Sequence, residues 1–237
     1  MKKSIVLATA VASILTSGVA AAELSANAAV TSNYIWRGIS QTNEAAAGQG
    51  GIDYGHDSGF YAGTWVSNVA FGNVNNAGYE MDIYAGFGGE AGGLGYDLGV
   101  ITYQYPLAPS TSFTEVYASG TMSIVTVGVA YTADAASGNK DLPFDSGDLY
   151  VSGSLDFPAG KNDISIYAGS YMFNADGTGA GKAGDLDYNH FGASISKDGF
   201  TFAMDKNDLD TTNFFAASDG SSDNVRFTAS YAIDFEL

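Results

Sequence analysis

The sequence predicts an all-β fold: a single antiparallel transmembrane β-barrel of about twelve strands, between ten and fourteen, with no helices in the mature chain. Three observations lead to this fold class. Segments that alternate apolar and polar residues recur along the chain, and long and short connections alternate between them. No apolar run in the mature chain approaches the roughly 20 residues that a membrane-spanning helix needs. A strand with one apolar face and two unpaired edges is stable in a bilayer only inside a closed barrel.

The first 22 residues are not expected to belong to the barrel. Lys2 and Lys3 form a short basic segment, residues 5–15 form an apolar run too short to span a bilayer, and Ala20 to Ala22 offer small residues before a cleavage point. This order is typical of a secretory signal peptide. We therefore expect a signal peptide over residues 1–22 and one outer-membrane barrel domain over residues 23–237.

The composition excludes several classes of protein. The chain has 46% hydrophobic residues, 31 glycines and no cysteine, and its formal net charge is −17 at pH 7. A disulfide framework is impossible, and so acidic a chain is not suited to binding nucleic acid. A soluble, secreted acidic protein is the alternative, but the sequence shows no second layer that would cover the apolar strand faces.

The last stretch, residues 223–237, gives the clearest strand. Every second residue from Val225 to Leu237 is apolar, and the intervening positions begin with Asn224 and Arg226 and end with Asp234 and Glu236. A strand with period two that ends the chain needs an earlier strand as its partner. The same alternation predicts the other strands at residues 24–37, 48–56, 60–70, 79–87, 94–105, 112–119, 122–132, 148–157, 161–173, 186–197 and 200–207.

The connections between these strands predict the orientation of the barrel. They are long after the first, third, fifth, seventh, ninth and eleventh strands, and they are tight turns after the second, fourth, sixth, eighth and tenth. With an even number of strands, both chain ends lie on the same side. Short periplasmic turns and longer outer loops are the outer-membrane pattern, so we expect both termini to be periplasmic.

Motifs for enzymatic chemistry are weak. Residues 86–91 imitate a dinucleotide-binding fingerprint, but the glycines that follow cannot open the helix that such a site needs. His56 and His190 are the only histidines, and no neighbouring residue orients either one as a base. We therefore predict that the protein is not an enzyme and has no catalytic, cofactor-binding or metal-binding residues.

Charged residues at inward positions are the strongest functional signal. Strand parity places Arg37 near the outer end of the first strand and Arg226 near the outer end of the last, and these two strands adjoin when the barrel closes. Opposed basic and acidic clusters in a lumen orient small polar solutes. The alternative is that these charges pair and plug the interior, as side chains do in narrow barrels. The pore-lining candidates are Arg37, Asp53, Glu80, Asp82, Tyr84, Asp97, Glu115, Asp148 and Arg226.

Several stretches resemble a known family. They include Ser32-Asn33-Tyr34-Ile35-Trp36-Arg37-Gly38-Ile39-Ser40-Gln41, Asp57-Ser58-Gly59-Phe60-Tyr61-Ala62-Gly63-Thr64-Trp65 and Tyr79-Glu80-Met81-Asp82-Ile83-Tyr84-Ala85-Gly86. These segments resemble the TorF family of proteobacterial porins, specifically in the first half of the chain and by pattern alone in the second. The resemblance implies an outer-membrane porin of a Gram-negative bacterium.

The expected function is a narrow passive diffusion channel for small hydrophilic solutes, with an acidic lumen that favours cations. The alternative is a non-conducting structural or adhesive barrel that acts through its acidic outer loops. The expected partners are outer-membrane lipid and lipopolysaccharide, the barrel-assembly machinery and small polar solutes, with no nucleic acid. We further expect Arg37 and Arg226 to form a positive patch opposite or beside Glu80 and Asp82, which defines the constriction. On this hypothesis, converting both arginines to alanine raises the preference for cations.

Overall fold

The computed structural model describes residues 23–71, 77–137, 144–174, 186–209 and 223–237. The expected signal peptide, residues 1–22, lies outside the described residues. Within the described ranges, no helix has the length and apolar character needed to cross a membrane. The only helical element there is a 3₁₀ turn, η1, at Pro109–Thr111.

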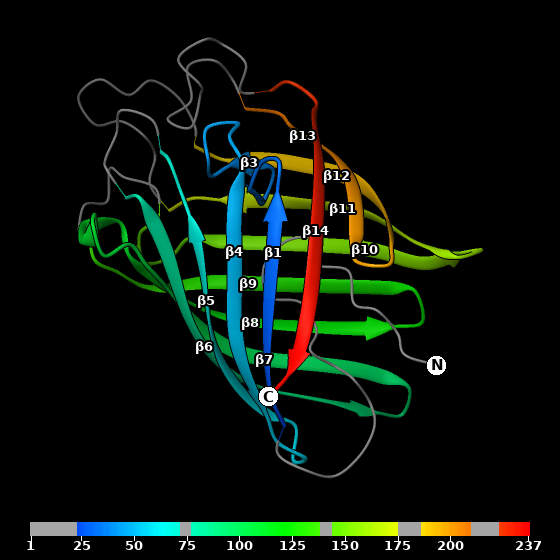
Figure 1. Ribbon diagram of the computed structural model, residues 1–237. Helices are drawn as coiled ribbons and strands as arrows, with labels where there is room; N and C mark the ends of the chain where they lie inside the picture. The colour runs from blue at the N-terminus through cyan, green and yellow to red at the C-terminus, as the bar shows by residue number, and fades with distance from the viewer. Residues whose placement is uncertain (1–22, 72–76, 138–143, 175–185, 210–222) are drawn as a thin grey trace.

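Twelve antiparallel strands form a closed barrel, as the sequence predicts. β1 closes it by pairing with β14 on one side and β4 on the other (Figure 1). The other strands pair in chain order. The barrel strands are β1 (Glu23–Thr31), β4 (Ala47–Gly55), β5 (Phe60–Asn68), β6 (Tyr79–Ala91), β7 (Leu94–Gln104), β8 (Phe113–Met122), β9 (Val125–Ala135), β10 (Leu149–Ala159), β11 (Asn162–Met172), β12 (Tyr188–Lys197), β13 (Phe200–Asn207) and β14 (Arg226–Glu236).

The alternation in the sequence becomes an apolar outer wall and a polar inner wall. On β14, Phe227 is 76% exposed, whereas its neighbour Arg226 is 9% exposed. On β9, Val125, Val127 and Val129 are exposed on the outer face. Successive side chains on a strand point to opposite faces, so each of these strands presents its apolar residues outward around the barrel.

The predicted alternation of connections is also confirmed. Tight turns at 56–59, 92–93, 123–124, 160–161 and 198–199 meet at one end of the barrel, which we call the short-turn end. The longer connections meet at the other end, the long-loop end. Both Glu23, at the start of β1, and Glu236, at the end of β14, lie at the short-turn end.

The expected first strand over residues 24–37 is wrong in its second half. β1 ends at Thr31, and the chain then forms a small hairpin from β2 (Ile35–Trp36) and β3 (Ile39–Ser40). Arg37 and Gly38 are the two central residues of its turn, with φ angles of 47° and 80°. Positive φ at both positions is the geometry of a type I′ turn, whose twist matches that of the flanking strands. The hairpin therefore reverses the chain where alternation alone predicted a continuous strand.

Candidate functional site

The β2–β3 hairpin crosses the lumen at the long-loop end of the barrel. It begins at the β1–β4 wall, yet the Arg37 side chain reaches Glu115 on β8, and the Gly38 carbonyl accepts a hydrogen bond from Asn207 Nδ2 on β13 at 2.7 Å. At its base, the Tyr34 hydroxyl donates to Glu80 on β6 at 2.9 Å. Contacts with strands on several sides show that the hairpin fills much of the barrel's cross-section at this level.

Arg37 at the hairpin tip makes the most extensive charged contact in the lumen. Its two terminal nitrogens each donate to one oxygen of Glu115 at 2.7 Å, a bidentate pair in which both side chains are buried. The guanidinium carbon lies 4.3 Å from the Trp36 ring, 4.1 Å from Tyr150 and 5.1 Å from Tyr171. Planar, weakly hydrated guanidinium suits such stacking and carboxylate pairing together. The arginine therefore fastens the hairpin tip to the opposite wall.

Aromatic side chains fill the space around the hairpin. Trp36 meets Tyr103 edge-on with ring centres 5.6 Å apart, and Tyr103 stacks on Phe113 at 4.5 Å. Phe113 in turn stacks on Phe144 at 4.8 Å. Aromatic pairs of this kind contribute about 0.5–1.5 kcal/mol each beyond the area they bury. We call the hairpin and this aromatic cluster, together with the inner wall around them, the packed half of the lumen.

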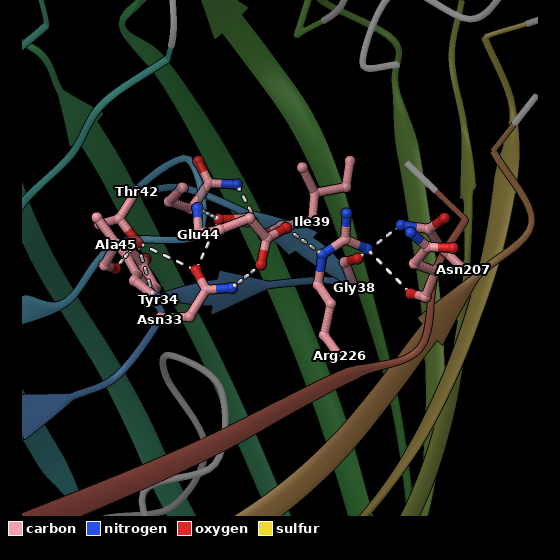
Figure 2. A network of polar contacts seen from close by, with 12 residues as sticks. Asn33, Tyr34, Gly38, Ile39, Thr42, Glu44, Ala45, Asn207 and Arg226 are labelled. Atoms are coloured by element: carbon pink, nitrogen blue, oxygen red, sulfur yellow. Dashed lines mark hydrogen bonds and ion pairs between the residues drawn. The ribbon is translucent and has the colours of Figure 1, made fainter. Parts of the chain in front are cut away.

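A second ion pair holds the outer part of the same connection. Glu44 lies between Asn33 and Arg226 (Figure 2), accepting from Asn33 Nδ2 at 2.7 Å and from Arg226 Nε at 2.7 Å. The Glu44 side chain is 51% exposed, unlike that of Glu115 at 1%. A half-exposed pair contributes less than a buried one because solvent screens it. It joins the β1–β4 connection to β14.

Two further carboxylates lie in the packed half, on the inward face of β6. Glu80 accepts hydrogen bonds from the hydroxyls of Tyr34 and Tyr105, so both of its oxygens have partners. Asp82 is also buried, but its Oδ1 atom has no hydrogen-bond partner among the described residues. Of these two acids on one strand, Glu80 therefore has a hydrogen-bond partner for each carboxylate oxygen, whereas Asp82 has an oxygen without one in the described part of the chain.

The rest of the lumen, toward the short-turn end, is lined differently. Here Tyr61 donates to Asp97 at 2.7 Å and shares a hydrogen bond with the hydroxyl of Tyr117, while Tyr84 donates to Asp53. Asp97 and the three tyrosines keep part of their surface accessible, as do small inward residues such as the serines 119, 152 and 165. We call this region, lined by tyrosine–carboxylate pairs and small residues, the open half of the lumen.

Glycines let the tyrosines of the open half lie flat against the wall. A Cβ on Gly99 would overlap the Tyr117 ring, and a Cβ on Gly86 would overlap that of Tyr61. In both cases the glycine and the tyrosine are directly opposite each other on neighbouring strands. Glycine in a strand interior often marks such a close approach. The arrangement keeps these rings out of the centre of the lumen.

The structure separates the nine predicted pore-lining residues into groups. Glu80, Asp82 and Glu115 lie in the packed half with Arg37, whereas Asp53, Tyr84 and Asp97 belong to the open half. The prediction that Arg37 lies on the first strand is wrong, because the chain turns at Thr31 and Arg37 occupies the hairpin tip. Arg37 pairs with Glu115 and Arg226 with Glu44, so the two arginines act in separate ion pairs.

Asp148 lies just before β10, at the long-loop rim. Its carboxylate accepts backbone hydrogen bonds from Asn174 at 2.7 Å and from Asp145 at 3.0 Å. Burial raises the pKa of this carboxyl to about 6, although those backbone donors oppose the shift. Its partners are backbone groups of two adjoining long loops, so this acid ties the loops together.

Sequence reasoning missed the partners of the charged groups. They are mainly aromatic: Tyr34, Trp36, Tyr61, Tyr103, Tyr105 and Tyr171. Parity is consistent with an inward face for the tyrosines of the barrel strands, but the predicted first strand put Tyr34 on its apolar face. The pairing of all these residues depends on strand register and on the position of the hairpin. One available signal was the coincidence of inward tyrosines with inward glycines on adjacent predicted strands.

Comparison with the KdgM porin supports the fold. The chain is similar to the KdgM porin, with a TM-score of 0.51 and 9% identity over 90% of this chain and 99% of that one. The NanC porin matches with a TM-score of 0.48 and 11% identity over 90% of this chain and 100% of that one. At identities this low, the likeness to KdgM concerns the barrel fold alone. No curated protein matches the sequence significantly.

A family model covers most of the chain. It describes bacterial proteins of unknown function under the name Gcw_chp and matches residues 16–233. The name TorF, expected from the resemblance of the first half, is not confirmed by this match. The chain belongs to Gcw_chp, a family of bacterial proteins of unknown function.

Proposed function

We propose that the protein is an outer-membrane porin, a narrow passive channel for small hydrophilic solutes with an acidic lumen that favours cations. The observation that carries this proposal is the open half of the lumen, where the Tyr61–Asp97 pair and small polar residues line a solvent-accessible wall and the buried Asp53 lies behind Tyr84. The apolar outer wall suits a bilayer, and twelve strands fall between barrels filled by side chains and wide porins. On this proposal the chain is exported and both termini are periplasmic.

The preference for cations follows from the lining of the open half. Asp53 and Asp97 receive hydrogen bonds from uncharged phenols and, for Asp53, from the amide of Asn27 at 3.1 Å. These partners are neutral, so they stabilise the carboxylates without cancelling their charge. A wall that carries negative charge in a confined space attracts cations and repels anions. The same proposal includes the pore-lining role predicted for the other candidates, which are Arg37, Glu80, Asp82, Tyr84, Glu115, Asp148 and Arg226.

A non-conducting structural or adhesive barrel is the second candidate, and the packed half favours it. The hairpin, the Arg37–Glu115 pair and the aromatic cluster fill the lumen near the long-loop end. If no path remains beside the hairpin, the barrel does not conduct and its long loops provide the working surface. The two candidates therefore differ in one measurable property.

Single-channel recording in planar bilayers separates the two candidates. We expect wild-type protein to give small, reproducible conductance steps, with a reversal potential in a KCl gradient that shows preference for K⁺ over Cl⁻. Asp53→Asn/Asp97→Asn should insert normally and lose much of that preference, because the open half then carries two fewer charges. Asp57→Asn/Asp198→Asn removes two exposed carboxylates from the tight turns, outside the strands that line the lumen, and provides the matched control. Absence of wild-type conductance would leave the non-conducting barrel as the function.

A further inference from the structure

One buried carboxylate oxygen lies in the packed half without a partner. The Asp82 side chain is 1% exposed, and its Oδ1 atom makes no hydrogen bond within the described part of the chain. Strand register places Asp82 directly between Trp65 on β5 and Tyr103 on β7, all three on the inward face. The oxygen therefore lies beneath the hairpin, between two aromatic neighbours.

The nearby acids do not share their partners with Asp82. Glu80 and Glu115 are its charged neighbours. Both oxygens of Glu80 accept from tyrosine hydroxyls, and both oxygens of Glu115 accept from Arg37. The cluster therefore contains three carboxyl groups and one guanidinium group, that of Arg37, which is already paired with Glu115. An anionic oxygen buried without a partner is costly, so Asp82 is expected to hold a positive species, either a proton or a bound cation.

A proton would neutralise Asp82 but would leave one of its polar atoms without a hydrogen-bond partner. A protonated carboxyl has one hydroxyl donor and one carbonyl acceptor, and each needs a partner when buried. If the proton were on Oδ1, that donor would be unpaired, and if it were on the other oxygen, Oδ1 would be an unpaired acceptor. A bound cation satisfies Oδ1 directly and also offsets the excess negative charge.

The surroundings indicate which cation fits. Within the described residues, no three histidine, cysteine or acidic side chains come together as a metal-binding set, so Asp82 is the one ionised ligand available here. Divalent calcium usually needs six or more oxygen ligands, several of them from carboxylates, so this arrangement does not suit it. Strand register places the aromatic residues Trp65 and Tyr103 on either side of Asp82, and aromatic rings attract a cation that lies over their faces. We propose that Asp82 holds a small monovalent cation of the sodium or potassium class beneath the β2–β3 hairpin.

This proposal concerns binding and does not require the barrel to conduct. It can therefore be tested on folded protein in detergent by thermal unfolding at pH 8. Chloride salts of Na⁺, K⁺ and N-methylglucamine are compared at equal ionic strength, so that only the identity of the cation changes. With Na⁺ or K⁺ in tenfold excess over its Kd, we expect Tm to rise by about 3–6 °C relative to N-methylglucamine and to saturate.

Asp82→Asn should abolish this rise in Tm, and Asp82→Ser serves as a second variant if the first does not fold. Asp97→Asn is the matched control, because it removes an inward carboxylate that already accepts from Tyr61, and it should retain the rise. Equal Tm values in all three salts would overturn the proposal, as would an unchanged response in either Asp82 variant. A wild-type Tm that depends on pH but not on the cation would assign Asp82 a proton instead. If the barrel binds the cation but does not conduct, the proposed channel function is wrong and the cation site at Asp82 stands.

Discussion

The two halves of the lumen use the same residue types to opposite effect. In the packed half, Tyr34 at the base of the hairpin and Tyr105 donate to Glu80, and both are buried. In the open half, Tyr61 donates to Asp97 while its ring lies over Gly86 and remains partly accessible. The residues that face the tyrosine decide whether it is buried. A tyrosine packed against the hairpin becomes part of a buried core, and a tyrosine that lies over a glycine stays on the inner wall with part of its surface accessible.

The halves also differ in how their charges are compensated. The packed half holds a buried ion pair between Arg37 and Glu115, whereas Asp53 and Asp97 in the open half have neutral donors. Burying a charge pair is favourable only when both members remain and their hydrogen bonds are satisfied. The packed half should therefore be sensitive to loss of one charge, and the open half should tolerate it.

The largest effect is expected from Arg37→Ala. It leaves Glu115 buried without its cation, and removal of one partner of a buried pair costs about 3–5 kcal/mol of unfolding free energy. Urea unfolding in detergent measures this loss. Lys206→Ala is the matched control, because Lys206 lies 3.9 Å from Asp223 in an exposed pair, for which about 0–1 kcal/mol is expected. Equal losses in the two variants would mean that packing alone holds the hairpin.

A smaller effect is expected from Gly38→Ala at the hairpin turn. Gly38 has a φ of 80°, and a Cβ there would overlap the Cβ of His190 on β12. Gly160→Ala is the control, because Gly160 has a φ of 70° but open space around it, so alanine there reports backbone strain alone. We expect Gly38→Ala to lose about 1–3 kcal/mol more unfolding free energy than Gly160→Ala. Identical losses would show that the hairpin can retreat from His190 freely.

The smallest effect on stability is expected from Gly99→Ala in the open half. The added methyl group would overlap the Tyr117 ring and lie 2.8 Å from the backbone oxygen of Ala85, so the ring moves from the wall into the lumen and the backbone shifts, at a cost of about 1–3 kcal/mol of unfolding free energy. Single-channel conductance should fall, because the displaced ring narrows the path. Gly95→Ala adds the same methyl group on the same inward face, but its nearest neighbour, Thr121, is 3.6 Å away. If Gly95→Ala lowers conductance as much as Gly99→Ala, the flat tyrosine is not what keeps the open half wide.

The barrel could be read from the sequence because its environment imposes a simple pattern. Alternation with period two and the alternating loop lengths gave the strand number, the closure and the inward acids. The hairpin could not be predicted in this way. Tyr34 and Trp36 continue the apolar face of the first strand, with Ile35 as the one interruption, and Arg37-Gly38 lacks the Asn-Gly or Asp-Gly signature of a type I′ turn.

The partners of the inward acids were also beyond reach of the sequence, for a related reason. Glu115 and Arg37 are 78 residues apart, and Asn27 and Asp53 are 26 apart. Strand parity gives the face on which a side chain lies, but not the register that brings it opposite another. A one-residue slip would move every one of these groups to the other face. The positions were therefore predictable while the contacts were not.

The long span of the hairpin's contacts has a consequence for the order of assembly. The hairpin follows β1 directly in the sequence. Yet Gly38 is hydrogen-bonded to Asn207, 169 residues away in the sequence, and Glu44 to Arg226, 182 residues away. These contacts can form only after β13 and β14 have paired with the rest of the barrel. Contacts between distant residues form slowly because the entropy of closing the intervening loop must be lost first. We therefore expect the β2–β3 hairpin, although it lies near the start of the barrel sequence, to reach its final position last. Until β14 pairs with β1, the assembling sheet is not closed into a barrel.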